Sequence, residues 1–219
     1  MALFQEMSLR WLYACEEGLE VLMFEIIGLG KPVRVILGGL HGREGILTEP
    51  ILRGVSKEVK KGSLILCNLS KRSRYISTLN RAYYQTKTGK RLLSLIRKHK
   101  PEIYIELHSY RRTVYSKLTD PYRKEKMGVP PLIDLEDGIL LGSVSPNIRI
   151  SEFRKHDLCL TLDVPAELND TYKVIKILNM AIASPSRFGF LKKLREMYPT
   201  QLRKAEKNFC EYFKEIEPF

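Results

Sequence analysis

Short apolar runs rich in β-branched residues alternate along this chain with longer stretches of helical periodicity. The runs predict strands at residues 19–28, 33–38, 63–68, 103–108 and 158–164. The other stretches predict helices at about 48–60, 90–100, 170–183, 186–197 and 200–216. Because strands and helices alternate without internal repeats, we expect a single α/β domain over residues 1–219. Its sheet should be mixed, mostly parallel and flanked by helices.

Two segments interrupt this alternation. Residues 69–90 form a polar loop with several Arg and Tyr residues. Residues 113–150 are rich in Pro and Gly, which is typical of connecting loops with short elements. Pro50 falls inside the first predicted helix, and because Pro is tolerated in a first turn, we expect that helix to begin near Thr48. Residues 1–18 mix aromatic and charged positions and are not assigned.

The turn after the strand at 33–38 carries the first candidate chemistry. Two glycines break the strand, and His41 and Glu44 follow, three positions apart, before the helical pattern begins. Open α/β sheets place their ligands outside the carboxyl ends of strands, so both side chains can point at one spot there. Imidazole and carboxylate together suit Zn²⁺, which in catalytic sites takes a third protein ligand and keeps one position open.

His108 is the candidate for the third ligand, because it ends the predicted strand at 103–108. The chain has only four His residues, so a second strand-end His strengthens the interpretation of a zinc site made by His41, Glu44 and His108. The alternative is that Glu44 caps the following helix and His108 caps its strand through a satisfied hydrogen bond.

The charge balance favours anionic partners. The chain has 37 Lys and Arg against 25 Asp and Glu, a formal charge of +12, which suits nucleic acid, small acidic molecules or membrane headgroups. It contains no helix-turn-helix, zinc-finger or aromatic RNA-binding motif, which makes a nucleic-acid partner the weaker hypothesis. The interleaved Arg and Tyr residues at 72–84 are its best support.

The compartment is predicted from the cysteines and the apolar content. The four cysteines include no Cys-x-x-Cys pair, and Cys67 and Cys159 fall inside strand-like runs where a free Cys acts as a small buried hydrophobe. No stretch reaches the ~18 apolar residues of a membrane span, and the N-terminal residues do not have the pattern of a secretory signal. We therefore expect a reduced, cytoplasmic protein without a membrane partner.

Several short motifs in order resemble one enzyme superfamily. Leu40-His41-Gly42-Arg43-Glu44 is similar to the His-x-x-Glu of zinc carboxypeptidases and of the related succinylglutamate desuccinylases and aspartoacylases. Leu107-His108-Ser109-Tyr110 resembles their later strand-end His, and Asn68, Arg74-Tyr75 and Asn80-Arg81 resemble the acylase loop between the two. The resemblance covers residues 32–110. It implies a zinc carboxypeptidase-like α/β fold and zinc-dependent hydrolysis of an amide bond beside a carboxylate.

The resemblance also suggests roles for the remaining polar residues. The substrate would be an N-acyl amino acid or a peptide C-terminus. Arg74 is the candidate for stabilising the oxyanion, and Asn80 and Arg81 for holding the substrate carboxylate, since Arg offers a planar bidentate fork. Arg43 and Tyr110 are further substrate-binding candidates, and a solvated basic loop is the alternative for the arginines.

The general base departs from the superfamily pattern. In the late strand, Asp163 stands where these enzymes have Glu, and it is one methylene shorter. Glu167 is the substitute candidate if the chain turns back at Pro165, and a plain strand-end residue is the alternative for Asp163. The second, β-rich domain of the aspartoacylases has no counterpart, so residues 113–150 or a partner subunit would have to supply the substrate walls. A basic nucleic-acid-binding or scaffold protein with a vestigial metal site is the alternative function.

Overall fold

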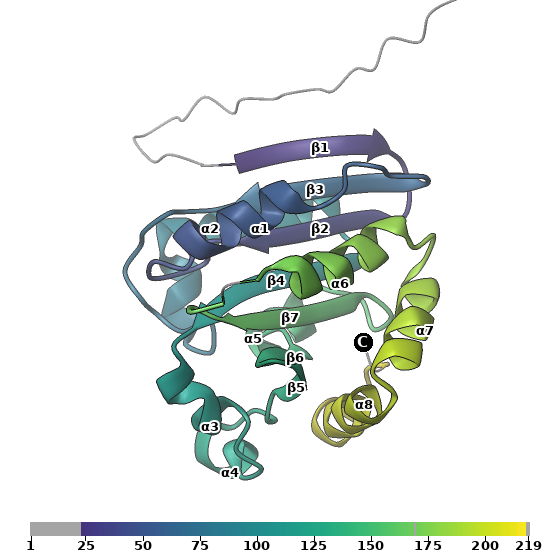
Figure 1. Cartoon of the computed structure of the whole chain (residues 1–219). Helices are drawn as coiled ribbons and strands as arrows, with labels where there is room; N and C mark the ends of the chain where they lie inside the picture. The colour runs from purple at the N-terminus through teal and green to yellow at the C-terminus, as the bar shows by residue number, and fades with distance from the viewer. Residues whose placement is uncertain (1–22, 169, 218–219) are drawn as a thin grey trace, which may run out of the picture.

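A seven-stranded sheet runs through the computed structural model, which describes residues 23–168 and 170–217 (Figure 1). In chain order its strands are β1 (Met23–Leu29), β2 (Val33–Gly38), β3 (Gly62–Asn68), β4 (Ile103–Tyr110), β5 (Ile133–Glu136), β6 (Ile139–Ser143) and β7 (Leu158–Pro165). In space their order is β1-β3-β2-β4-β7-β6-β5. The four strands β3, β2, β4 and β7 are parallel, and β1, β6 and β5 add to the two sides in antiparallel pairings. The predicted mixed α/β sheet is confirmed.

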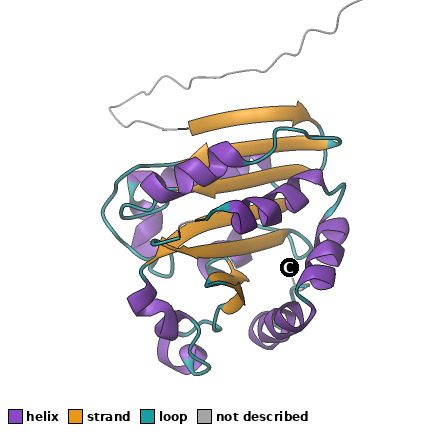
Figure 2. Ribbon diagram, in the orientation of Figure 1, coloured by secondary structure: helices purple, strands orange, loops and turns teal. Residues whose placement is uncertain are grey.

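Helices cover both faces of this sheet (Figures 1 and 2). They are α1 (Gly45–Gly54), α2 (Lys87–His99), α3 (Tyr115–Leu118), α4 (Arg123–Met127), α5 (Pro146–Ser151), α6 (Tyr172–Ala183), α7 (Arg187–Met197) and α8 (Pro199–Phe213). One apolar cluster joins α1, α6, α7 and α8 to one face, and a second joins α2 and α5 to the other. The central strands are therefore buried on both sides, which explains their near-continuous apolar sequences.

The chain reverses its direction of winding between β2 and β4. From β2 it passes through α1 to β3 on one side, and from β3 it returns through α2 to β4 on the other side of β2. The connections that leave β2 and β4 therefore diverge and open a crevice at the carboxyl ends of these strands. Such a switch point is where open α/β sheets bind their ligands, and the residues after β2 and near the end of β4 are the ones that carry His41 and His108.

The first helix differs from its prediction. It begins at Gly45 and ends at Gly54, so Pro50 lies inside the helix and not in its first turn. An interior Pro cannot donate to the carbonyl four residues earlier. That carbonyl belongs to Ile46, a residue 39% exposed, and water can reach this part of the turn.

The segment 113–150 contains more regular structure than connecting loops. Its strands β5 and β6 form a hairpin whose turn is Asp137-Gly138, both with positive φ, at 53° and 84°. Two consecutive positive φ angles are the requirement of a type I′ hairpin turn, and Asp-Gly is among its preferred sequences. The hairpin extends the sheet beyond β7 and, with α3 and α4, builds the wall beside the carboxyl end of β4 (Figure 1).

The other predicted elements lie within a few residues of the observed ones, and the predicted positions 19–22 of the first strand fall outside the described residues. Cys67 and Cys159 are buried as expected, and burial raises the pKa of the Cys67 thiol to about 12. Among the described helices, none combines the length and apolar character needed to cross a bilayer.

Candidate metal centre

The turn between β2 and α1 is fixed by close backbone packing against β3. Gly39 has a φ of 69°, and a Cβ there would lie 2.3 Å from Asn68 Oδ1. Asn68 is fully buried at the end of β3, where its side-chain amide donates to Gly45 O at 2.9 Å and its Oδ1 accepts from Thr48 Oγ1 at 3.3 Å. The start of α1 is thereby tied to β3, which fixes the turn that carries His41 and Glu44.

Glu44 occupies the N-cap position of α1, but its carboxylate makes no capping hydrogen bond. Its Oε1 accepts from the backbone N–H groups of Leu40 at 2.6 Å and His41 at 3.0 Å. Its Oε2 lies 3.4 Å from His41 Nδ1 and 3.2 Å from His108 Nδ1. The carboxylate thus faces the two imidazoles, and the helix-cap alternative for Glu44 is excluded.

His108 lies within β4, two residues before its end, and uses both ring nitrogens. Nδ1 faces Glu44, while Nε2 lies 3.2 Å from Oε2 of Glu106, two positions earlier on the same face of the strand. Glu106 is itself 1% exposed and accepts from the Tyr104 hydroxyl at 2.8 Å. If Nε2 carries the proton that Glu106 accepts, Nδ1 is left with its lone pair available for a cation.

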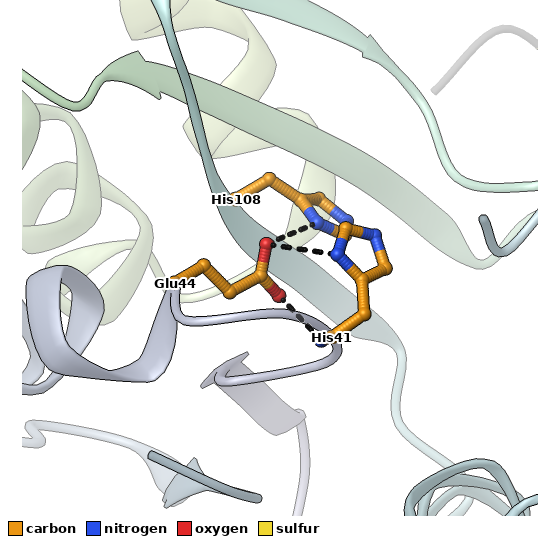
Figure 3. A group of neighbouring side chains, drawn as sticks. All are labelled: His41, Glu44 and His108. Atoms are coloured by element: carbon orange, nitrogen blue, oxygen red, sulfur yellow. Dashed lines mark hydrogen bonds and ion pairs between the residues drawn. The ribbon is translucent and has the colours of Figure 1, made fainter. Parts of the chain in front are cut away.

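Three ligand atoms of His41, Glu44 and His108 lie within 4.8 Å of one another. The two imidazole rings are stacked with centroids 5.1 Å apart, and Figure 3 shows a nitrogen of each ring directed at the Glu44 carboxylate. Two imidazole nitrogens and one carboxylate oxygen form a donor set that suits catalytic zinc and leaves a further position open. The three residues could therefore hold a metal ion, as the sequence predicted.

Burial and neighbouring charges shift the pKa values of the three residues in different directions. Burial lowers the pKa of His41, and the neighbouring charge of His108 adds to that effect. Burial would also lower the pKa of His108, but Glu44 and Glu106 overcome it and raise the pKa well above its ordinary value. The same histidines hold the pKa of the buried Glu44 carboxyl below its ordinary value. Without a cation, His108 is the group that balances the buried carboxylates, so a metal that binds here must displace its proton.

A cavity of about 550 Å³ opens over the three ligands. Arg43, Tyr110 and Asp163 line it together with His41, Glu44 and His108. Tyr110 donates its hydroxyl to Gly138 O at 2.6 Å, and so also connects β4 to the β5–β6 turn. Within the described part of the chain, the cavity lining does not include Arg74, Asn80, Arg81 or Glu167, all of which are exposed.

Residues 29–214 match DUF2119, a family described as "Uncharacterized protein conserved in archaea". The chain belongs to this family. Over 193 residues it is 38% identical to the uncharacterized protein MJ0501 of Methanocaldococcus jannaschii, an alignment that covers 84% of this chain and 92% of that protein. No solved structure matches the chain. Neither description states an activity or a superfamily, so in this DUF2119 member the resemblance to zinc carboxypeptidases rests on the motif residues.

The candidate base of this DUF2119 protein lies in register with the third ligand. Asp163 on β7 is the direct partner of His108 on β4, and Thr161 is the partner of Glu106. The Thr161 hydroxyl donates to Asp163 Oδ1 at 2.7 Å, which orients the carboxylate on the cavity side of the sheet. Asn80, in contrast, uses its side chain as the N-cap of a 3₁₀ helix, η1 (Arg81–Gln85), where it accepts from Ala82 N at 2.9 Å.

The charged cavity residues Glu106 and Arg123 were not among the sequence-based candidates. Glu106 is detectable in principle, because alternation along β4 places it on the same face as His108. Arg123 on α4 also lines the cavity, and burial lowers the pKa of its guanidinium. Its segment has no motif, and only the packing of α3 and α4 beside the β5–β6 hairpin brings it to the site.

Proposed function

We propose that this protein is a zinc-dependent hydrolase that cleaves an amide bond next to a carboxylate, as an N-acyl amino acid deacylase or a carboxypeptidase-like enzyme. The observation that carries the proposal is the convergence of His41, Glu44 and His108 on one point beneath an open cavity. The cavity volume of about 550 Å³ falls in the range of small-molecule sites, roughly 300–1,000 Å³.

The residues present fit the metal that the resemblance implies. His41 and His108 offer imidazole nitrogens, Glu44 offers Oε2, and Glu106 fixes the orientation of the His108 ring. Zinc in such a site acts as a Lewis acid and lowers the pKa of water from 15.7 to around 7.

Asp163 is the proposed general base. It lies beside His108 across the β4–β7 pairing and faces the cavity, where it can take a proton from water and pass it to the leaving nitrogen. Glu167 lies in the exposed turn after β7 and outside the cavity lining, so among the two candidates the placement favours Asp163.

The substrate contacts follow the resemblance only in part. Arg43 and Tyr110 line the cavity. Arg74, Asn80 and Arg81 lie in the loop between β3 and α2, and under this proposal they would act at the rim and not on the cavity wall. The oxyanion role of Arg74 accordingly requires its exposed side chain to turn into the cavity, which its neighbour Tyr75 already lines.

The test is the metal content of the purified wild-type protein beside His108→Ala, grown with zinc available. His156→Ala is the matched control, because His156 is 64% exposed at the surface and outside the cavity lining. We expect about one zinc per chain in the wild type and the control, and none in His108→Ala. The zinc-loaded wild type is then assayed on N-acetyl amino acids and short peptides.

Absence of zinc from the wild type would refute the hydrolase proposal. The basic surface would then be tested as a nucleic-acid interface, because binding to phosphates weakens steeply with added salt. One zinc per chain with no turnover of either substrate class would keep the metal centre and refute the enzymatic part.

A further inference from the structure

The segment 111–132 forms one wall of the cavity, and that wall combines two guanidinium groups, the exposed one of Arg111 and the partly buried one of Arg123, with apolar side chains. Arg123 lines the cavity from α4. Val114, Leu118, Val129 and Leu132 line it from the same segment. The wall therefore presents the partly buried guanidinium of Arg123 and an apolar surface to the same cavity.

Arg123 carries a charge that the protein itself leaves largely unmatched. It is partly buried, and Nη1 donates to the backbone carbonyl of Pro130 at 2.5 Å. Among the described residues, no carboxylate lies within 4 Å of its guanidinium, although the negative charge of Asp163 acts on it from a greater distance. A guanidinium removed from water is ordinarily paired with an anion, so this one has the capacity to take an anion from a ligand.

The wall is held in place by contacts at both sides. The Tyr115 hydroxyl donates to Asp134 Oδ2 of β5 at 2.7 Å, and Leu132 N donates to Leu118 O at 2.9 Å. The Tyr212 hydroxyl on α8 donates to Gly128 O at 2.8 Å, immediately after α4. A guanidinium on a fixed wall loses little freedom when it binds a planar carboxylate, which favours a role as an anchor.

We propose that Arg123 anchors the carboxylate of the substrate and that the apolar wall beside it selects an uncharged, aliphatic or aromatic side chain. The substrate class is then an N-acyl derivative of an apolar amino acid, or a peptide that ends in one. This inference rests on the proposed function for the scissile amide, and it differs from the resemblance, which assigns the carboxylate to Asn80 and Arg81. An acidic substrate such as an N-acyl aspartate would place its second carboxylate against Val114 and Leu118 at the cost of its hydration.

The experiment measures the binding of N-acetyl-L-leucine and N-acetyl-L-leucinamide by calorimetry, to metal-free and zinc-loaded protein. The two probes differ only in the carboxylate. Arg123→Met is compared with Arg81→Met, with Arg123→Lys, and with Arg203→Met, a control on an exposed position of α8 outside the cavity lining. Circular dichroism and thermal unfolding check that each variant is folded.

We expect the wild type to prefer the carboxylate over the amide by about tenfold or more, the range of a charge-assisted hydrogen bond. Arg123→Met should abolish that preference, and Arg123→Lys should keep part of it, because Lys retains the charge but lacks the bidentate fork. Arg81→Met and Arg203→Met should leave the preference unchanged. N-acetyl-L-aspartate should bind the wild type at least several-fold more weakly than N-acetyl-L-leucine.

Loss of the preference in Arg81→Met with retention in Arg123→Met would overturn the assignment, as would equal binding of the two probes by the wild type. If Arg123→Met does not fold, a preference in Arg123→Lys that is clearly smaller than in the wild type would support the bidentate role, and an unchanged preference in that variant would overturn it. The binding measurements on metal-free protein test the role of Arg123 even if the protein binds no zinc. Failure of the proposed function and failure of this inference are therefore distinguishable.

Discussion

Replacing Glu106 by Gln tests whether the buried carboxylate behind His108 sets the strength of the metal site. The Gln side chain has nearly the same shape, and its oxygen can still accept from His108 Nε2, while its amide can face the Tyr104 hydroxyl. The substitution therefore removes the negative charge and keeps both contacts. The effect on the metal is then separated from damage to the fold.

The magnitude follows from the role of the contact. Carboxylates that orient a metal-bound His are worth 10–100-fold in metal affinity, which corresponds to about 1.4–2.7 kcal/mol. We expect Glu106→Gln to lie near the lower end, about tenfold, because the hydrogen bond survives. In Glu106→Ala, Tyr104 and His108 both lose a buried partner, at roughly 1–3 kcal/mol each. We therefore expect that variant to lose about 2–6 kcal/mol of unfolding free energy as well as metal affinity.

Zinc affinity is measured by competition with a chelating dye, and stability by urea unfolding of the metal-free protein. The control is Glu102→Gln, which lies just before the other end of β4 and pairs with Lys31 at 3.3 Å. It should leave the zinc affinity unchanged. A zinc affinity in Glu106→Gln within twofold of the wild type, with His108→Ala still metal-free, would refute the argument that Glu106 tunes the site.

Three further predictions concern catalysis, acid stability and backbone packing. Asp163→Asn should keep its zinc and lower kcat by about 10²–10⁴-fold on any amide substrate that the wild type cleaves; retention of kcat would exclude Asp163 as the base. The pKa of Glu136 is lowered chiefly by its bonds to Lys173 and Tyr198, so its contribution to stability is present above pH 4.5 and lost as the pH falls through the lowered pKa. Glu136→Gln should thus lower the unfolding free energy by less than about 1 kcal/mol at pH 7, since the Glu136 and Lys173 side chains are 32% and 40% exposed. Its stability should fall less steeply on acidification than that of the wild type, and parallel acid profiles in urea would contradict this. Gly45→Ala would place a Cβ 1.8 Å from the carbonyl oxygen of Ser70. We therefore expect the variant to lose several kcal/mol of unfolding free energy, measured by thermal unfolding. An unfolding midpoint equal to that of the wild type would show that the backbone at Ser70 can shift at little cost.

The candidate metal ligands could be predicted from the sequence because they depend on local signals. His41 and Glu44 are three residues apart in a turn that two glycines define, and His108 follows an apolar run, so strand ends alone bring them to one edge of a sheet. The central strands were predictable for the same reason. They are buried on both faces and read as uninterrupted apolar runs.

The walls of the cavity depend on packing between distant segments and could not be predicted in the same way. Arg123 follows no apolar pattern, and α4 spans only five residues, so its position is set by contacts with Pro130 and with α8. The β5–β6 hairpin is a different case. Asp137-Gly138 between two apolar runs is a recognised hairpin signal that the Pro and Gly content of the segment obscured.

The register between β4 and β7 determines where Asp163, the proposed base, lies relative to His108. Adjacent strands lie about 4.8 Å apart, so the Cα of Asp163 is a direct neighbour of the Cα of His108, and its carboxylate begins beside the metal centre. The Thr161 hydroxyl holds that carboxylate on the cavity side. A slip of one residue in this pairing would turn Asp163 to the opposite, apolar face, where Leu162 and Val164 now pack. The sheet therefore sets the position from which the candidate base Asp163, one methylene shorter than Glu, extends beside His108.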